Sequence, residues 1–157
     1  AKNLKNFKHI DGITISSNEV YYANKLNINN YKCYFLNKHK NDAFSDNLYG
    51  DYDFIIDVNL KSFSCCQQSF DYMFLNYTKI LNKNGQILSG KKGMNWTSSL
   101  KPVLRFSFKK FFYKKLKEYP GKKNNILTID ECLKLSKKFS LNFVEEKSSN
   151  IVRFIKF

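Results

Sequence analysis

Arginine is nearly absent from this sequence: only Arg105 and Arg153 occur among 27 basic residues. Arginine is the side chain that recognises guanine edges and grips phosphate groups with paired hydrogen bonds. The 13 acidic residues leave a net charge of +14, which can indicate a nucleic-acid partner because bound cations release counterions. A bias of composition toward lysine, asparagine, isoleucine, phenylalanine and tyrosine explains the same charge. The scarcity of arginine makes nucleic acid the less favoured partner.

The sequence also lacks the pattern of a zinc site. No CxxC pair occurs among its four cysteines, Cys33, Cys65, Cys66 and Cys132, and only two histidines could join them as ligands. We therefore expect no metal site. Reduced thiols of this kind are typical of a cytoplasmic protein.

Long apolar runs are missing as well. A helix needs about 20 consecutive apolar residues to cross a bilayer, and no stretch approaches that length. The first five residues are not followed by an apolar run, so they do not resemble a secretory signal. A length of 157 residues with 43% hydrophobic residues suits one domain with a sizeable core. We expect a single domain without a membrane span.

What is present is an alternation of strand-like apolar runs with amphipathic segments of helical period. The predicted strands cover residues 12–16, 32–36, 53–58, 86–90, 142–146 and 151–157. The predicted helices cover residues 17–26, 63–81 and 131–139. This order predicts an α/β fold with a mainly parallel sheet and an antiparallel C-terminal strand.

Three short motifs indicate where the helices begin or end. Ser17 and Asn18 are expected to cap the first helix, because short polar side chains accept its free amide groups. Residues 128–131 resemble a capping box at the start of the last helix. Asn84-Gly85 is expected to close the middle helix, because glycine adopts left-handed backbone at little cost.

Residues 11–19, with the sequence DGITISSNE, resemble the second strand and following turn of class I S-adenosylmethionine-dependent methyltransferases, a Rossmann-like family. The likeness is greatest to the cyclopropane-synthase-like branch, which has a similar glycine-aliphatic-threonine-aliphatic-serine turn. In the wider family an acidic residue ends this strand and binds the ribose hydroxyls, whereas Thr14 stands here. The resemblance therefore implies that the backbone of Thr14 and Ile15, with Asn18 or Glu19, takes over that contact.

Four further segments match the family in order. Residues 41–44 are similar to its adenine-binding acidic motif, residues 52–57 to its fourth strand, residues 81–88 to the turn into its fifth strand, and the terminal hairpin to its reversed last strand. The resemblance implies that S-adenosyl-L-methionine is the cofactor and that a methyl group passes to a small molecule. The cofactor-binding residues that it implies are Thr14, Ile15, Asn18, Asp42, Ala43 and Asp57. The substrate-binding residues that it implies are Asn59, Lys92 and Trp96, and no catalytic residue is assigned.

The family's first strand and glycine-rich loop have no counterpart in the sequence. We therefore expect an N-terminally incomplete methyltransferase-like domain over residues 1–157, whose natural form is longer at the N-terminus. A sheet without its central strand exposes unpaired backbone groups, so association into a homo-oligomer is an open alternative. A basic and aromatic insertion lies near residues 91–120, and its densest part, residues 106–119, is either a packed amphipathic helix or a lid, membrane-surface or dimer contact.

Each candidate residue also has an ordinary structural interpretation. Asp42 could be a turn residue, Asp57 a structural carboxylate and His39 a solvated loop histidine. The aromatic residues Tyr21, Tyr22 and Phe44 could stack on adenine or belong to the core. The alternative function is a non-catalytic methyltransferase-like binding module that uses its basic face to bind nucleic acid or a protein.

Overall fold

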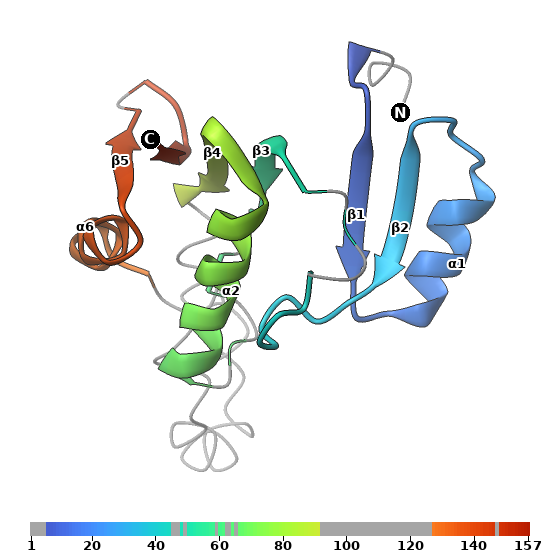
Figure 1. Ribbon diagram of the computed structural model, residues 1–157, viewed down its shortest axis with the longest axis horizontal. Helices are drawn as coiled ribbons and strands as arrows, with labels where there is room; N and C mark the ends of the chain where they lie inside the picture. Colours follow the sequence, from blue (N-terminus) through green and yellow to red (C-terminus); the bar gives the residue numbers. More distant parts are fainter. Residues whose placement is uncertain are drawn as a thin grey trace, which may run out of the picture.

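A computed structural model describes the chain in two parts that lie side by side (Figure 1). The described residues are 6–44, 48, 50–58, 60–61, 64, 66–91, 127–146 and 148–157. Their strands are β1 (Ile10–Thr14), β2 (Tyr31–Phe35), β3 (Tyr52–Ile56), β4 (Leu81–Gly90), β5 (Leu141–Glu145) and β6 (Ile151–Lys156). Their helices are α1 (Ser17–Lys25), α2 (Gln67–Ile80) and α6 (Ile129–Lys138). This order confirms the predicted α/β alternation.

The strands form two separate sheets. One sheet holds β1 and β2 as a parallel pair, with Gly12 beside Cys33. The other has the order β3-β4-β6-β5, in which β3 and β4 are parallel and β6 runs antiparallel to both of its neighbours. The expected parallel sheet with an antiparallel C-terminal strand is therefore confirmed, with a break between β1 and β3.

The main core lies between the four-stranded sheet and α2, with α6 beside it. Phe154 of β6 is fully buried, and its ring lies 5.3 Å from that of Phe74 on α2 and 5.2 Å from that of Phe143 on β5. Lys156 then donates to the carbonyl oxygens of Thr78 and Leu81 at 2.7 and 2.6 Å. These carbonyls stand at the C-terminal end of α2, where helix carbonyls lack helical partners. Strand β6 thus packs against α2 and also caps the C-terminal end of this helix.

Helix α1 packs on β1 and β2 without burying any residue completely. Its cap is Ser16, one position before the predicted Ser17-Asn18 pair, and the Ser16 hydroxyl accepts from the amide of Glu19 at 3.3 Å. Helix α6 begins as predicted, because Thr128 and Glu131 form a reciprocal capping box. Local capping signals therefore place both helix starts to within a residue or two.

The prediction that Asn84-Gly85 closes the middle helix through left-handed backbone at the glycine is wrong. Helix α2 ends at Ile80, before this pair, and the left-handed residue is Asn84 with φ of 65°. Gly85 has a different function: a Cβ atom there would lie 2.8 Å from the carbonyl oxygen of Tyr52. The glycine allows β4 to approach the start of β3, which is a contact between distant segments.

Several predicted features lie outside the described residues. They are the candidate substrate residues Asn59, Lys92 and Trp96 and nearly all of the basic insertion, including residues 106–119. Within the part of the chain that is described, no helix is both long and apolar enough to span a membrane.

Candidate functional site at the carboxyl ends of β1, β2 and β3

The carboxyl ends of β1, β2 and β3 meet at one edge of the molecule. The amide of Leu36, just after β2, donates to the carbonyl oxygen of Thr14 at 3.0 Å. Two residues further on, the ammonium group of Lys38 donates to the carboxylate of Asp57, just after β3, at 2.6 Å. Ligands of open α/β sheets bind outside the carboxyl ends of the strands. Two of the predicted cofactor residues, Thr14 and Asp57, therefore lie at the edge where such a ligand would bind.

At the end of β1, the hydroxyl group of Thr14 donates to the carboxylate of Glu19. The same hydroxyl oxygen accepts from the amide of Ser16 at 3.2 Å, which fixes its orientation. Glu19 lies in the first turn of α1 and is exposed, as are Ile15 and Asn18. Strand β1 thus ends without an acidic residue, but Glu19 of the following helix brings a carboxylate to Thr14, the last residue of the strand. Among the residues that the resemblance offered for this position, Glu19 is the one with the defined contact.

The loop after β2 places Asp42 and Ala43 differently. Asp42 adopts left-handed backbone, with φ of 49°, and its carboxylate lies 2.6 Å from the ammonium group of Lys79 on α2. Both side chains are about half exposed, so this ion pair is weak, worth under about 1 kcal/mol. Ala43 packs against the main core, and Phe44 is buried with its ring stacked on that of Tyr77. Phe44 is therefore a core residue, whereas Tyr21 and Tyr22 are exposed on α1.

Asp57 is held by two donors and is largely buried. Its Oδ2 atom accepts from Lys38 at 2.6 Å and from the hydroxyl group of Tyr77 at 2.8 Å. Burial of the Tyr77 ring, reinforced by the nearby Asp57 charge, raises the pKa of the Tyr77 hydroxyl well above its usual range. Tyr77 therefore stays protonated and continues to donate. Asp57 thus joins the loop after β2 to β3 and α2, and its predicted contact with the cofactor stays a prediction.

The buried Asn76 of α2 also contacts the loop after β2: its side-chain amide donates to the carbonyl oxygen of Lys40 at 2.8 Å. His39 lies in the same loop and is buried, so the expectation of a solvated histidine is wrong. The loop is fixed to α2 by contacts at Lys40, Asp42 and Phe44, and Lys38 joins it to Asp57 at the end of β3. These contacts hold the loop after β2 against α2 and β3.

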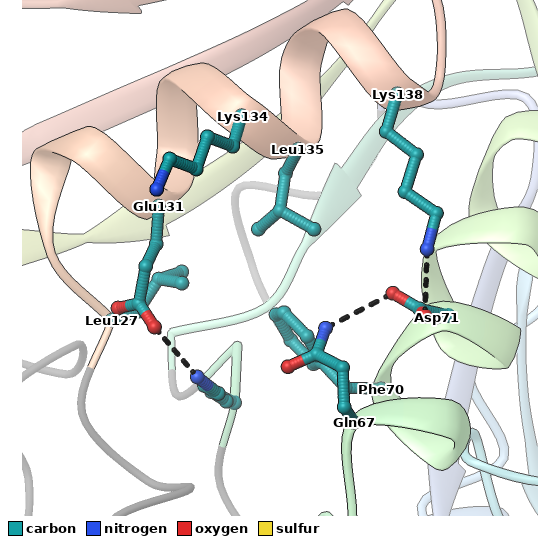
Figure 2. Close-up of a pocket in the computed structure, with 9 residues that line it drawn as sticks. Gln67, Phe70, Asp71, Leu127, Glu131, Lys134, Leu135 and Lys138 are labelled. Carbon is teal, nitrogen blue, oxygen red and sulfur yellow. Dashed lines mark hydrogen bonds and ion pairs between the residues drawn. The ribbon is translucent and has the colours of Figure 1, made fainter.

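A pocket lies between α2 and α6, away from the ends of β1, β2 and β3 (Figure 2). It has a volume of about 290 Å³ and an apolar floor formed by Phe70, Leu127 and Leu135. Two ion pairs line its rim, Lys61 with Glu131 at 3.1 Å and Lys138 with Asp71 at 2.7 Å. No predicted site residue lines this pocket. Sequence reasoning had no signal for it, because the paired residues are 70 and 67 positions apart.

The described part of the chain contains no group of three histidine, cysteine, aspartate or glutamate side chains that could hold a metal ion. The polar groups near the carboxyl ends of β1, β2 and β3 are carboxylates, a hydroxyl group and the ammonium groups of Lys38 and Lys79. The carboxylate and hydroxyl oxygens can accept from hydroxyl and amino groups of a polar organic ligand, whereas the ammonium groups can only donate.

No family model and no curated protein matches this sequence. Solved structures do match, at low identity. The N-methyltransferase NodS from Bradyrhizobium japonicum aligns with 95% of this chain and 74% of its own, at 11% identity and a TM-score of 0.58. A SAM-dependent methyltransferase from Methanosarcina mazei aligns with 96% of this chain and 83% of its own, at 13% identity and a TM-score of 0.59. A cyclopropane synthase from Mycobacterium tuberculosis aligns with 90% of this chain and 50% of its own, at 15% identity and a TM-score of 0.56.

The topology and these likenesses define a Rossmann-like α/β domain. More particularly, the chain has the fold of class I S-adenosylmethionine-dependent methyltransferases. The resemblance drawn from the sequence is thereby confirmed for the fold. The assignments of individual site residues remain predictions.

Proposed function

We propose that the protein is an S-adenosylmethionine-dependent methyltransferase that acts on a small molecule. The observation that carries this proposal is the Thr14–Glu19 contact at the end of β1, beside the converging ends of β2 and β3. A carboxylate in this position suits a ribose diol, because it can accept a hydrogen bond from each of two neighbouring hydroxyl groups. Solved structures with this fold include NodS in complex with S-adenosyl-L-homocysteine.

The hydrogen-bond acceptors of this site fit the nucleoside part of such a cofactor. Glu19 would accept from the ribose hydroxyls, with Thr14 orienting it and Ile15 and Asn18 flanking it. Asp42 would accept from the adenine amino group after exchanging its exposed partner Lys79, and Ala43 would lie beside the base. Asp57, together with Lys38, would fix the loop that carries both residues.

When bound, the cofactor supplies a methyl group that its sulfonium makes electrophilic. The protein then has to align an acceptor and exclude water, so a dedicated catalytic residue is not required. Asn59, Lys92 and Trp96 remain the candidates for acceptor binding.

Calorimetric titration of the full-length natural protein with S-adenosyl-L-homocysteine tests the proposal. We expect saturable binding with one site per chain. Asp42→Ala should weaken it by about 1–3 kcal/mol, as expected when a hydrogen bond at a ligand is lost. Lys79→Ala is the matched control, because it removes an exposed partner of Asp42 and should leave affinity equal or higher. Absence of binding to the full-length protein would refute the proposal and favour the alternative of a binding module that acts through its basic face.

A further inference from the structure

The pocket between α2 and α6 has a floor of buried apolar side chains. Phe70 of α2, Leu135 of α6 and Leu127, just before α6, form this floor. Its volume of about 290 Å³ is near the lower limit of roughly 300 Å³ for pockets that hold organic ligands. The floor therefore suits a small apolar group, such as a single ring or a short aliphatic chain.

Glu131, on the rim of this pocket, uses both of its carboxylate oxygens within the protein. Its Oε2 atom accepts from the backbone amide of Thr128 at 2.8 Å, in the capping box of α6, and its Oε1 atom accepts from Lys61 at 3.1 Å. Burial alone would raise the pKa of this carboxyl, but the hydrogen bonds from Thr128 and Lys61 outweigh burial and lower the pKa. Glu131 therefore stays ionised, and both of its oxygens already have donors.

Asp71, on the α2 side of the pocket, is engaged in the same way. Its Oδ1 atom accepts from the side-chain amide of Gln67 at 3.1 Å, and its Oδ2 atom pairs with the ammonium group of Lys138 at 2.7 Å (Figure 2). Each carboxylate that lines the pocket thus has a donor on each oxygen. A cationic ligand would have to displace one of these donors, so the pocket does not favour a cation.

The lysines that line the pocket have donors to spare, because an ammonium group has three N–H donors and no acceptor. The side chain of Lys61 is only 6% exposed, and its ammonium group lies 5.5 Å from the centre of the Phe70 ring. Glu131 is its one hydrogen-bond partner among the described residues. A buried polar group is costly unless it is hydrogen-bonded, so the remaining N–H groups of Lys61 favour an acceptor on a bound ligand.

Lys134 adds a second ammonium group at the same end of the pocket. It lies three positions after Glu131 on α6, a spacing that makes the two side chains neighbours, and Figure 2 shows its side chain extending toward Glu131. Within the part of the chain that is described, Lys134 has no ion pair or hydrogen bond of its side chain. Three lysines against two carboxylates leave the lining of the pocket with a net charge of +1. One negative charge on a ligand would balance it.

We propose that this pocket binds a small monocarboxylate whose apolar body is a single ring or a short aliphatic chain. The body lies on the floor formed by Phe70, Leu127 and Leu135, and the carboxylate accepts from Lys61 and Lys134. None of the residues predicted to bind the cofactor or its acceptor lines this pocket, so the proposal does not rest on the proposed function.

Ligand-observed NMR titration of the full-length protein tests the proposal, with benzoate and hexanoate as probes. We expect saturable binding of at least one of them, and the tighter of the two identifies the body as a ring or a chain. Benzamide keeps the ring without the charge, and acetate keeps the charge without the apolar body. Each should bind about tenfold more weakly than benzoate. Equal affinity for benzoate and benzamide would overturn the proposal, as would no binding of either probe.

Two substitutions on α6 test the position of the carboxylate. Lys134→Gln should weaken binding of the tighter probe about fivefold, because one charged donor is lost. Its fold should be unchanged, since Lys134 is exposed. Lys137→Gln is the matched control, an exposed lysine of the same helix that does not line the pocket, and it should change affinity less than about twofold. Equal affinities of the two variants would overturn the assignment of the carboxylate to this pocket.

Titration of the same samples with S-adenosyl-L-homocysteine separates this proposal from the proposed function. Lys134→Gln should leave the affinity for this compound unchanged. Binding of S-adenosyl-L-homocysteine without binding of either carboxylate would overturn only the pocket proposal, and the reverse result would overturn only the proposed function. Displacement of the bound carboxylate by S-adenosyl-L-homocysteine would place it at the carboxyl ends of β1, β2 and β3 and overturn the pocket proposal.

Discussion

The side-chain amide of Asn24 hydrogen-bonds to both backbone groups of Cys33, donating to its carbonyl oxygen at 2.9 Å and accepting from its N–H at 2.8 Å. Because Cys33 lies in β2, Asn24 of α1 acts toward this strand as a short piece of neighbouring strand would. An edge strand with free backbone groups is prone to pair with other chains. One helix side chain therefore protects the edge of the two-stranded sheet.

Asn24→Ala should lower the free energy of unfolding by about 1–2 kcal/mol, because two hydrogen bonds to partly buried backbone groups are lost. Urea denaturation measures the change. The control is Asn29→Ala in the exposed turn before β2, which should change stability by less than about 0.5 kcal/mol. If both variants unfold at the same urea concentration, the amide contacts do not contribute to stability.

Two phenylalanines near the end of the chain provide a test of the core. Phe154 is fully buried, whereas Phe157 is 72% exposed. Phe154→Ala should cost about 3–5 kcal/mol, since it leaves a cavity between Phe74 and Phe143. Phe157→Ala should cost under about 0.5 kcal/mol. Thermal unfolding of both variants checks the packing, and similar losses would show that the core is placed wrongly.

Alkaline pH should destabilise the protein through Tyr77. Burial, with the charge of Asp57, raises the pKa of this hydroxyl well above its usual range, whereas in the unfolded chain it ionises near pH 10, roughly its ordinary value. Above that pH the unfolded state has released a proton that the folded state retains, so stability falls as pH rises. Tyr77→Phe should be less stable at neutral pH, because the bond to Asp57 is lost, yet its stability should decline less steeply at high pH. Denaturation at a series of pH values distinguishes the two slopes, and parallel slopes would exclude Tyr77 as the cause.

The proposed contact of Glu19 with the ribose predicts that Glu19→Gln weakens binding of S-adenosyl-L-homocysteine by about 1–3 kcal/mol, since a charged acceptor is replaced by a neutral one. Thr14→Val should weaken it less, because only the residue that orients Glu19 changes. Asp130→Asn is a matched control, as Asp130 is also an acidic residue in the first turn of a helix, α6. Calorimetry on the full-length variants measures all three. Unchanged affinity in Glu19→Gln, with binding retained, would remove Glu19 from the site but leave the proposed function intact.

Features that depend on neighbouring residues were predictable from the sequence. The capping box of Thr128 and Glu131 needs three residues of spacing, and it starts α6 as expected. Glu19 lies five positions from Thr14, so the sequence could suggest it as a substitute for the usual strand-end acid. Contacts between distant segments were not predictable. Gly85 is required by the carbonyl group of Tyr52, which no local pattern indicates.

In the candidate site, too, local features were predictable and contacts between distant segments were not. Asp57 is recognisable as the residue after a strand, but its partners Lys38 and Tyr77 lie 19 and 20 positions away. Only the folded chain shows that both partners use the Oδ2 atom of Asp57. His39 was expected in solvent because it follows a strand in a polar segment, and the packing of that loop on α2 buries it.

The order of strands in the larger sheet differs from the order in which the strands are synthesised. Strand β6 is made after β5, yet it lies between β4 and β5 and brings Phe154 and Lys156 to α2. Until residue 156 has left the ribosome, β4 and β5 share no partner and the carbonyl groups at the end of α2 are uncapped. The nascent chain therefore exposes Phe74 and the edge of β4 from the time these segments emerge until β6 emerges, and partly folded chains with exposed apolar surface are prone to aggregate. A ribosome pause just before the codon for Ile151 would prolong that exposure.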